Sequence, residues 1–146
     1  MLRAAGAGGR VRILDEPAPT ASSAAAQLGI EVGAIANSLI FTTDTGEAVL
    51  VLASGAHRVD PALLAGLLDA DTVRRARPDE VRTATGQPIG GVAPVGHPAA
   101  LRTVIDEDLR RYAEIWAAGG VPHAVFPTTY AELVRLTGAR EGQVAS

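Results

Sequence analysis

The sequence lacks cysteine and lysine altogether and has few aromatic residues. Without cysteine there can be no disulfide framework, thiol nucleophile or zinc-thiolate centre. All 13 basic residues are arginines, and 16 acidic residues bring the net charge to -3. This balance argues against a protein that coats nucleic acid through bulk charge, so any RNA contact must be local. At 3% aromatic residues, a sheet that stacks bases on aromatic rings is not expected either.

Long apolar runs and a targeting segment are also missing. The apolar runs end well before the roughly 20 residues that a membrane span needs, and the first ten residues have no apolar core of a secretory signal. We therefore expect a soluble, cytoplasmic protein with no membrane partner. Three scattered histidines do not suggest a metal centre, and no cofactor is expected. With 146 residues, we expect a flexible tail over residues 1–9 and a single domain over residues 10–146.

The first half of the chain alternates strand and helix patterns. Thr20 is typical of a helix N-cap and Gly29 of a helix end, while β-branched and apolar segments on both sides of "DTG" predict a hairpin. Asp60 followed by Pro61 predicts the start of a second helix. The expected elements are strand 10–15, helix 21–28, strands 36–43 and 47–53, a helix from residue 61, strand 72–76 and a helix within 77–86.

The second half begins with a segment that cannot be an ordinary helix. "GQPIGGVAPVGHP", residues 86–98, holds four glycines and three prolines. It has neither the lysine of a P-loop nor the strand-to-helix context of a dinucleotide-binding fingerprint. We expect a strand over 101–106, one helical turn over 107–111, a hairpin, and a last helix capped by Thr128 and ended by Gly138. Strands and helices mixed with hairpins predict an α+β domain around a mixed sheet.

Four stretches together resemble one known family. They are "PAPTASSAAAQLGI", "IANSLIF" with "VLVLASGAHRVD", "GGVAPVGHP" with "VIDEDL", and "AVFPTTYAELVRLTG". In this order and spacing, over roughly residues 11–138, they resemble the YbaK/prolyl-tRNA synthetase-associated editing-domain family. The resemblance implies an α+β fold with a mixed, partly barrel-like sheet flanked by helices. It also implies hydrolysis of the ester of a wrongly charged tRNA, most often tRNA for proline carrying alanine or cysteine.

The sequence departs from this family at Asn37, the only asparagine in the chain. The family typically carries a lysine at this position, which helps to hold the aminoacyl end of the tRNA. An amide can donate and accept hydrogen bonds, but it cannot neutralise a phosphate. Because the chain has no lysine, no neighbouring lysine can replace the lost charge.

The chemistry that the resemblance implies needs a positioned water and stabilisation of the carbonyl oxygen, without a covalent nucleophile. The glycine loop could supply main-chain N–H groups at Gly90, Gly91 and Gly96, although it could equally be a structural turn. Asp106 matches an active-site aspartate of the family and could orient the amino group or the water; the alternative is a helix cap.

Further polar residues are candidates for contact with the substrate. His97 could donate a hydrogen bond, or it could simply pack within its loop. Thr20, Ser38 and Ser54 offer hydroxyl groups near the expected cleft, although Thr20 could serve only as a cap. His57 and His123 are expected to be loop residues without a role. Several arginines could contact phosphates, with solvated surface charge as the alternative: Arg58, Arg74, Arg75, Arg77 and Arg82.

Three functions remain open at this point. The first is a freestanding trans-editing deacylase that acts on an aminoacylated tRNA acceptor end, with a synthetase as a possible partner. In it Asn37, Gly91, Gly96 and Asp106 are the catalytic residues. The second is a non-catalytic module that kept the fold and binds an acceptor end, a nucleotide or a protein. The third is hydrolysis of a small ester unrelated to tRNA. The sequence does not indicate an oligomeric state.

Overall fold

A computed structural model of the chain describes residues 12–13, 21–85, 102–118 and 124–145. The expected tail, residue Thr20 and the glycine loop lie outside these ranges. In chain order the elements are β1 Arg12–Ile13, α1 Ala21–Leu28, η1 Val32–Ala34, β2 Ile35–Thr43, β3 Ala48–Ser54, α2 Pro61–Leu68, β4 Val73–Arg75, α3 Pro78–Thr85, β5 Arg102–Asp106, η2 Glu107–Arg111, β6 Ile115–Ala118, β7 Ala124–Thr128, α4 Tyr130–Thr137 and β8 Arg140–Gly142.

These strands form one mixed sheet in the order β1-β7-β6-β2-β3-β5-β8, with β4 paired to β2 off this path. Strand β2 is central: it pairs antiparallel with β3 and β4 and parallel with β6. Strand β5 is parallel to both β3 and β8. The prediction of an α+β fold around a mixed sheet is confirmed.

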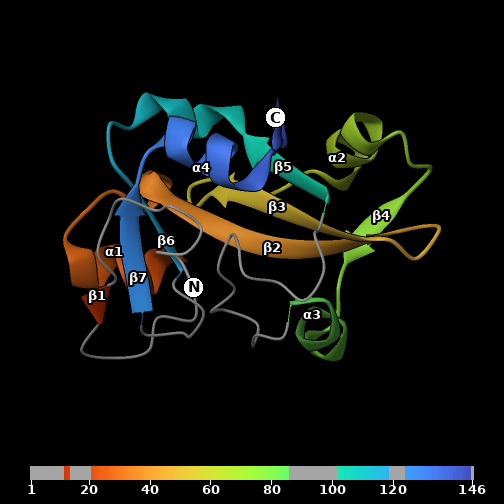
Figure 1. Cartoon of the computed structure of the whole chain (residues 1–146), viewed down its shortest axis with the longest axis horizontal. Coiled ribbons are helices and arrows are strands. Elements are labelled where there is room, and N and C mark those ends of the chain that lie inside the picture. The colour runs from red at the N-terminus through yellow and green to blue at the C-terminus, as the bar shows by residue number, and fades with distance from the viewer. Residues whose placement is uncertain (1–11, 14–20, 86–101, 119–123, 146) are drawn as a thin grey trace.

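The two faces of the central strands are buried against different helices. On one face, α4 and α3 contribute to a cluster with inward residues of β2, β3 and β5, including Leu133, Val81, Ile40 and Leu52. On the other face, α2 packs against alternate residues of the same strands in a cluster that includes Phe41 and Leu64. Figure 1 shows α2 and α3 on opposite sides of β4, and α1 at the far end of the molecule near β1 and β7.

Most of the helix caps and helix ends predicted from the sequence are observed in the structure. The side chain of Asp60 accepts a hydrogen bond from the backbone of Ala62, which confirms the predicted cap of α2. Gly29 and Gly138 both have positive φ angles, as expected of glycines that end helices. The predicted cap of α4 is wrong by one residue: Thr129 caps the helix, and Thr128 belongs to strand β7.

Among the described residues, no helix is both long enough and apolar enough to cross a membrane. Of the strand expected over residues 10–15, the two described residues form β1, and the others lie outside the described ranges. The hairpin expected after residue 111 is confirmed, since β6 and β7 pair antiparallel.

Candidate functional site

The sheet register places Asn37 and Asp106 on the same face of the sheet. Asn37 of β2 pairs with Ala53 of β3, and Leu52 pairs with Ile105 of β5. Ala53 and Asp106 follow Leu52 and Ile105, so they point to the same face as Asn37. With strands spaced about 4.8 Å apart, the backbones of Asn37 and Asp106 are separated by about 10 Å. The small side chain of Ala53 lies between them.

Ser38 points to the opposite face, because successive residues of a strand alternate. Its neighbours on that face, Ile40 and Leu52, belong to the cluster covered by α3 and α4. The Ser38 hydroxyl oxygen is buried and has no hydrogen-bond partner within the described part of the chain. Asn37 and Ser38 therefore point to opposite faces of the sheet, whereas the sequence prediction placed the Ser38 hydroxyl near the expected cleft.

Asp106 ends β5 and is only 1% exposed. Its Oδ2 accepts hydrogen bonds from the backbone N–H of Ser54 at 3.1 Å and lies 2.7 Å from Nδ1 of His57. Its Oδ1 accepts the backbone N–H of Asp108 at 3.1 Å, which makes Asp106 the N-cap of η2. The cap that the sequence offered as the alternative is thus present. Three protein groups thus occupy the carboxylate of Asp106.

His57 lies between two carboxylates. Its Nδ1 is 2.7 Å from Oδ2 of the buried Asp106, and its Nε2 is 3.1 Å from Oδ2 of Asp108. The His57 side chain is 26% exposed and that of Asp108 is 46% exposed. The expectation that His57 is a loop residue without a role missed this cluster. In the sequence, only Asp106 and Asp108 lie close enough to suggest a cluster. His57 is 49 positions away from Asp106, so no local pattern connects it with them.

The turn that carries His57 is fixed by main-chain and hydroxyl bonds. The Ser54 hydroxyl donates to the carbonyl of Gly33 at 2.8 Å, and the His57 N–H donates to the Ser54 carbonyl at 2.9 Å. The Gly55 N–H donates to the carbonyl of Ile35 at 2.8 Å. Ser54 is 2% exposed, and its hydroxyl holds this turn against η1 and is already paired inside the protein. We therefore leave Ser54 out of the proposed substrate contacts.

Two carboxylates on either side of one imidazole can share a proton. If both ring nitrogens carry hydrogen, each donates to a carboxylate; if one nitrogen is bare, its lone pair faces a negative oxygen, which is repulsive. One ligand atom from each of His57, Asp106 and Asp108 lies within 4.8 Å of the others. However, the two carboxylates face different ring nitrogens on opposite sides of the imidazole. In this arrangement each carboxylate is within hydrogen-bonding distance of its own ring nitrogen.

Five of the site residues predicted from the sequence lie outside the described ranges. They are Thr20, Gly90, Gly91, Gly96 and His97. Their parts in the site stay predictions. Of the other four, the structure brings Asn37, Ser54 and Asp106 to neighbouring positions of β2, β3 and β5, and it places Ser38 on the other face.

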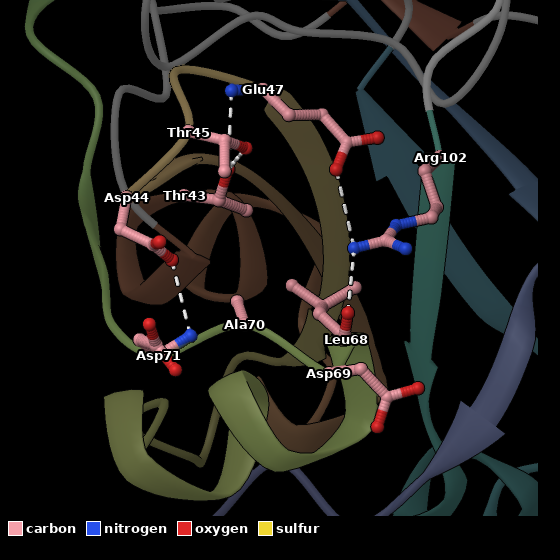
Figure 2. Close-up of a pocket in the computed structure, with 9 residues that line it drawn as sticks. All are labelled: Thr43, Asp44, Thr45, Glu47, Leu68, Asp69, Ala70, Asp71 and Arg102. Atoms are coloured by element: carbon pink, nitrogen blue, oxygen red, sulfur yellow. Dashed lines mark hydrogen bonds and ion pairs between the residues drawn. The ribbon is translucent and has the colours of Figure 1, made fainter.

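A pocket of about 400 Å³ lies elsewhere, at the opposite end of β5. Arg102 at the start of β5 pairs with Glu47 at 3.2 Å and donates to the carbonyl of Leu68 at 3.0 Å. Figure 2 shows that Asp44 points across the pocket toward the backbone of Asp71, whose N–H it accepts at 3.1 Å. The carboxylates of Glu47 and Asp44 therefore already bond to other groups of the protein. The pocket lies a strand's length from Asp106 and does not include it.

The arginines proposed as phosphate contacts differ in their surroundings. Arg74 makes a two-pronged ion pair with Glu80, at 2.8 and 3.0 Å, and the Arg74 guanidinium lowers the pKa of the Glu80 carboxyl to about 2. Arg77 lies 3.7 Å from the same carboxylate. Arg75 stacks over the ring of Phe41, with its guanidinium carbon 5.7 Å from the ring centre. Contact of any of these with RNA stays a prediction.

Comparison with known proteins identifies the family. The aminoacyl-tRNA editing domain matches residues 15–136. The chain belongs to this family. The editing domain thus covers the elements from α1 through α4 that carry the site described above, and the resemblance read from the sequence is confirmed.

Relatives of the editing domain include parts of larger enzymes and separate proteins. Proline--tRNA ligase of Nitratidesulfovibrio vulgaris is 33% identical over 102 residues, which are 70% of this chain but 17% of the ligase. The uncharacterized protein YwhH of Bacillus subtilis is 29% identical over 114 residues, 78% of this chain and 72% of that protein. The chain therefore spans about one sixth of the length of the ligase and most of the length of YwhH.

Solved structures share the fold over nearly the whole chain. The crystal structure of a candidate trans-editing enzyme for prolyl tRNA synthetase is 44% identical, with a TM-score of 0.91, and covers 99% of this chain and 92% of that chain. The hypothetical protein APE2540 is 32% identical, with a TM-score of 0.91, and covers 99% and 96% of the two chains. The similarity supports a trans-editing deacylase at the level of the family.

Proposed function

We propose that this editing domain hydrolyses the ester bond of a mischarged tRNA in trans. The observation that carries the proposal is the likeness to the candidate trans-editing enzyme, which extends over 99% of the chain at 44% identity. With a TM-score of 0.91 the two chains share one fold. The register supports a site on this face, because it aligns a half-buried amide and a buried carboxylate on either side of the small Ala53.

The reaction fits the functional groups of the chain. An aminoacyl ester is intrinsically labile, so positioning of a water molecule and stabilisation of the developing oxyanion can suffice. The main-chain N–H groups of Gly90, Gly91 and Gly96 are the proposed oxyanion donors. Asn37 would hydrogen-bond the ribose hydroxyl or the ester carbonyl, in place of the charged lysine of the family. Thr20 and His97 remain proposed contacts to the substrate.

The proposed substrate is tRNA for proline that carries a small amino acid such as alanine or cysteine. A synthetase pocket discriminates against one methylene by only about 1 to 3 kcal/mol and cannot exclude a smaller side chain sterically. A second site that accepts small side chains and rejects the cognate one removes such errors. The acceptor end of the tRNA is then the partner, and a synthetase that recruits the domain in trans is a further proposed partner.

A deacylation assay tests the proposal. Purified protein is mixed with alanyl-, cysteinyl- and seryl-tRNA species and with correctly charged prolyl-tRNA, and ester loss is followed against the spontaneous rate. We expect faster loss of at least one small amino acid from tRNA for proline, and no acceleration with prolyl-tRNA. No acceleration with any species would refute the deacylase.

The replacement of the family lysine by Asn37 favours a second candidate. Without that charge, a module could retain the fold and bind an acceptor end without hydrolysing the ester. Binding of tRNA by gel shift or fluorescence anisotropy, combined with an unchanged rate of ester loss, would favour this non-catalytic module. Competition by uncharged tRNA separates both candidates from an esterase that acts on small molecules, whose rate would not respond to tRNA.

A further inference from the structure

We propose that His57 is the general base of the deacylation reaction, oriented by Asp106 and regulated by Asp108. This inference rests on the proposed function and adds to it a catalytic residue on the β3–α2 turn. A base for ester hydrolysis must accept a proton from water near neutral pH, and histidine is the side chain best suited to this exchange. Within the described part of the chain, His57 is the only histidine.

The first support is the orientation of the imidazole. A buried carboxylate that accepts the Nδ1 hydrogen fixes the tautomer of a histidine and leaves Nε2 to accept a proton. Asp106 meets this requirement: its side chain is 2% exposed and its Oδ2 lies 2.7 Å from Nδ1. The backbone of Ser54 and the backbone of Asp108 hold the same carboxylate at 3.1 Å each. Asp106 is thus a rigid orienting group and not itself the base.

The second support is the position of Nε2 beside a carboxylate at the surface of the protein. Nε2 points toward Asp108, whose side chain is 46% exposed, while His57 retains 26% of its own exposure. When His57 is protonated, the two groups form an ion pair at 3.1 Å. In the structure Asp108 occupies Nε2, and a bare Nε2 and the carboxylate repel each other. The proposed mechanism therefore requires the Asp108 side chain to leave this position and a water molecule to take its place.

The third support is the location of the pair relative to Asn37. Asp106 and Asn37 share one face of the sheet, about 10 Å apart across two strand spacings. An aminoacyl ester held by Asn37 and extended along this face would reach the end of β5, where His57 lies. A water molecule bound at Nε2 would be the nucleophile for an ester carbonyl placed between Asn37 and His57.

The step balances without any further reactant. The water oxygen bonds to the ester carbonyl carbon while one water proton passes to Nε2 of His57. The tetrahedral intermediate then releases the ribose oxygen as the carbon–oxygen bond breaks, and the proton on Nε2 passes to that oxygen. The products are a free ribose hydroxyl and the free amino acid, and His57 returns to its starting form. The charged groups that face the ring throughout are Asp106 from β5 and Asp108 from η2.

The main test replaces His57 by a side chain that keeps the hydrogen bond but cannot take the proton. His57→Gln can still donate to Asp106. We expect it to lower kcat by about 100-fold, the usual contribution of a general base, with KM little changed. His57→Ala should lose activity similarly and regain it in proportion to added imidazole. Imidazole should not rescue Asn37→Ala, which serves as the control for non-specific stimulation.

A second measurement uses the pH dependence of kcat. In the wild type the rate should fall at acidic pH as the base becomes protonated, and this fall should be absent from His57→Gln. Asp108→Asn removes the carboxylate beside Nε2, so the profile of this variant should differ from that of the wild type. The matched control is Glu107→Gln, also in η2, which pairs with Arg110 at 3.7 Å instead and should leave the profile in place.

Several results would overturn the inference. A His57→Gln variant that folds and retains wild-type kcat on an active wild-type background would remove His57 from the mechanism and leave the deacylase standing. Activity that disappears with a chelator and returns with Zn²⁺ would replace proton transfer by metal chemistry. If the wild type deacylates none of the tRNAs, the proposed function fails and this inference fails with it. If His57→Ala does not fold, His57→Gln and the Asp108→Asn profile still decide the question.

Discussion

The two ends of strand β5 hold charged residues in contrasting surroundings. At its start, Arg102 pairs with Glu47 beside the pocket, and the two side chains are 45% and 44% exposed. At its end, the side chain of Asp106 is 2% exposed and is held by two backbone N–H groups and His57. Only about four residue rises, roughly 13 Å, separate the two ends. The same strand thus carries one charge that water can solvate and one that the protein alone must stabilise.

This difference shows which charges the fold depends on. An exposed ion pair gains little, since water screens it and both side chains lose conformational freedom. Removal of a buried carboxylate leaves its hydrogen-bond donors buried without a partner, which destabilises the folded state. We therefore expect the Asp106 end to be sensitive to substitution and the pocket end to be tolerant. The predictions below test this contrast, beginning with the largest expected effect.

Asp106→Ala should destabilise the protein by about 3 kcal/mol, because it leaves the Ser54 N–H, the Asp108 N–H and His57 without their acceptor. Urea unfolding followed by circular dichroism measures this. Asp106→Asn keeps one acceptor oxygen and should lose less. If Asp106→Ala lowers the unfolding free energy no more than a surface substitution does, the contrast between the two ends is wrong.

Asn37→Ala should lower kcat/KM for deacylation by about tenfold, the worth of one hydrogen bond to the substrate. Asn37→Lys restores the residue type of the family and should preserve or raise the rate. Both rates are measured with the best substrate from the tRNA panel, after thermal melts confirm that the variants fold. Wild-type turnover by Asn37→Ala would show that this amide does not contact the substrate.

Arg102→Ala should change the unfolding free energy by less than about 1 kcal/mol, since its ion pair with Glu47 is half exposed. Its hydrogen bond to the carbonyl of Leu68 is the other contact that is lost. A double-mutant cycle with Glu47→Gln isolates the ion pair. A coupling energy as large as the cost of Asp106→Ala would mean that exposure does not explain the difference between the two ends.

The smallest expected effect on stability concerns Glu80, which lies near the pocket end of the sheet, where β4 pairs with β2. Its pKa is lowered from 4.5 to about 2, first by the hydrogen bond from Arg74. A lowered pKa stabilises the folded state above the unfolded value near 4.5, and this contribution disappears as the pH falls through 2. NMR titration of the Glu80 carboxyl should show its midpoint near 2.

Arg74→Ala should return this midpoint toward 4.5, whereas Arg140→Ala, a remote arginine that donates to the carbonyl of Leu67, should not. Since Glu80 lies at the surface, the unfolding free energy should hardly change in either variant. A midpoint that stays near 2 in Arg74→Ala would assign the shift to the backbone N–H of Arg77, which also donates to Glu80.

Local signals were sufficient for most of the fold. The turn residues between the first two long strands, the cap at Asp60 and the glycine at position 138 act on neighbours within a few positions, and the corresponding hairpin and helices are all observed. The error at Thr128 has the same origin. Two adjacent threonines both satisfy the cap preference, and only the pairing of Thr128 in β7 leaves Thr129 to cap α4.

The candidate site was harder to predict because it depends on register. The alternation of a strand would have separated Asn37 from Ser38 on sequence alone, and the sequence interpretation did not use it. The prediction of Asp106 as an important carboxylate came from the family resemblance, and its catalytic part stays a proposal. No local pattern connects His57 with Asp106, so its position in the cluster could not be read from the sequence.

The sequence by itself determined most of the strands and helices in their order along the chain, the family, and the absence of a thiol or a lysine amine from the chemistry. These follow from composition and from interactions between near neighbours. The sequence did not predict η1 or β8. The tertiary structure alone decided that His57 lies between Asp106 and Asp108 and that Asp106 shares a face with Asn37. The physical reason is that side chains distant along the chain meet only when strands pair in one register, and that register is set by burial of the whole sheet.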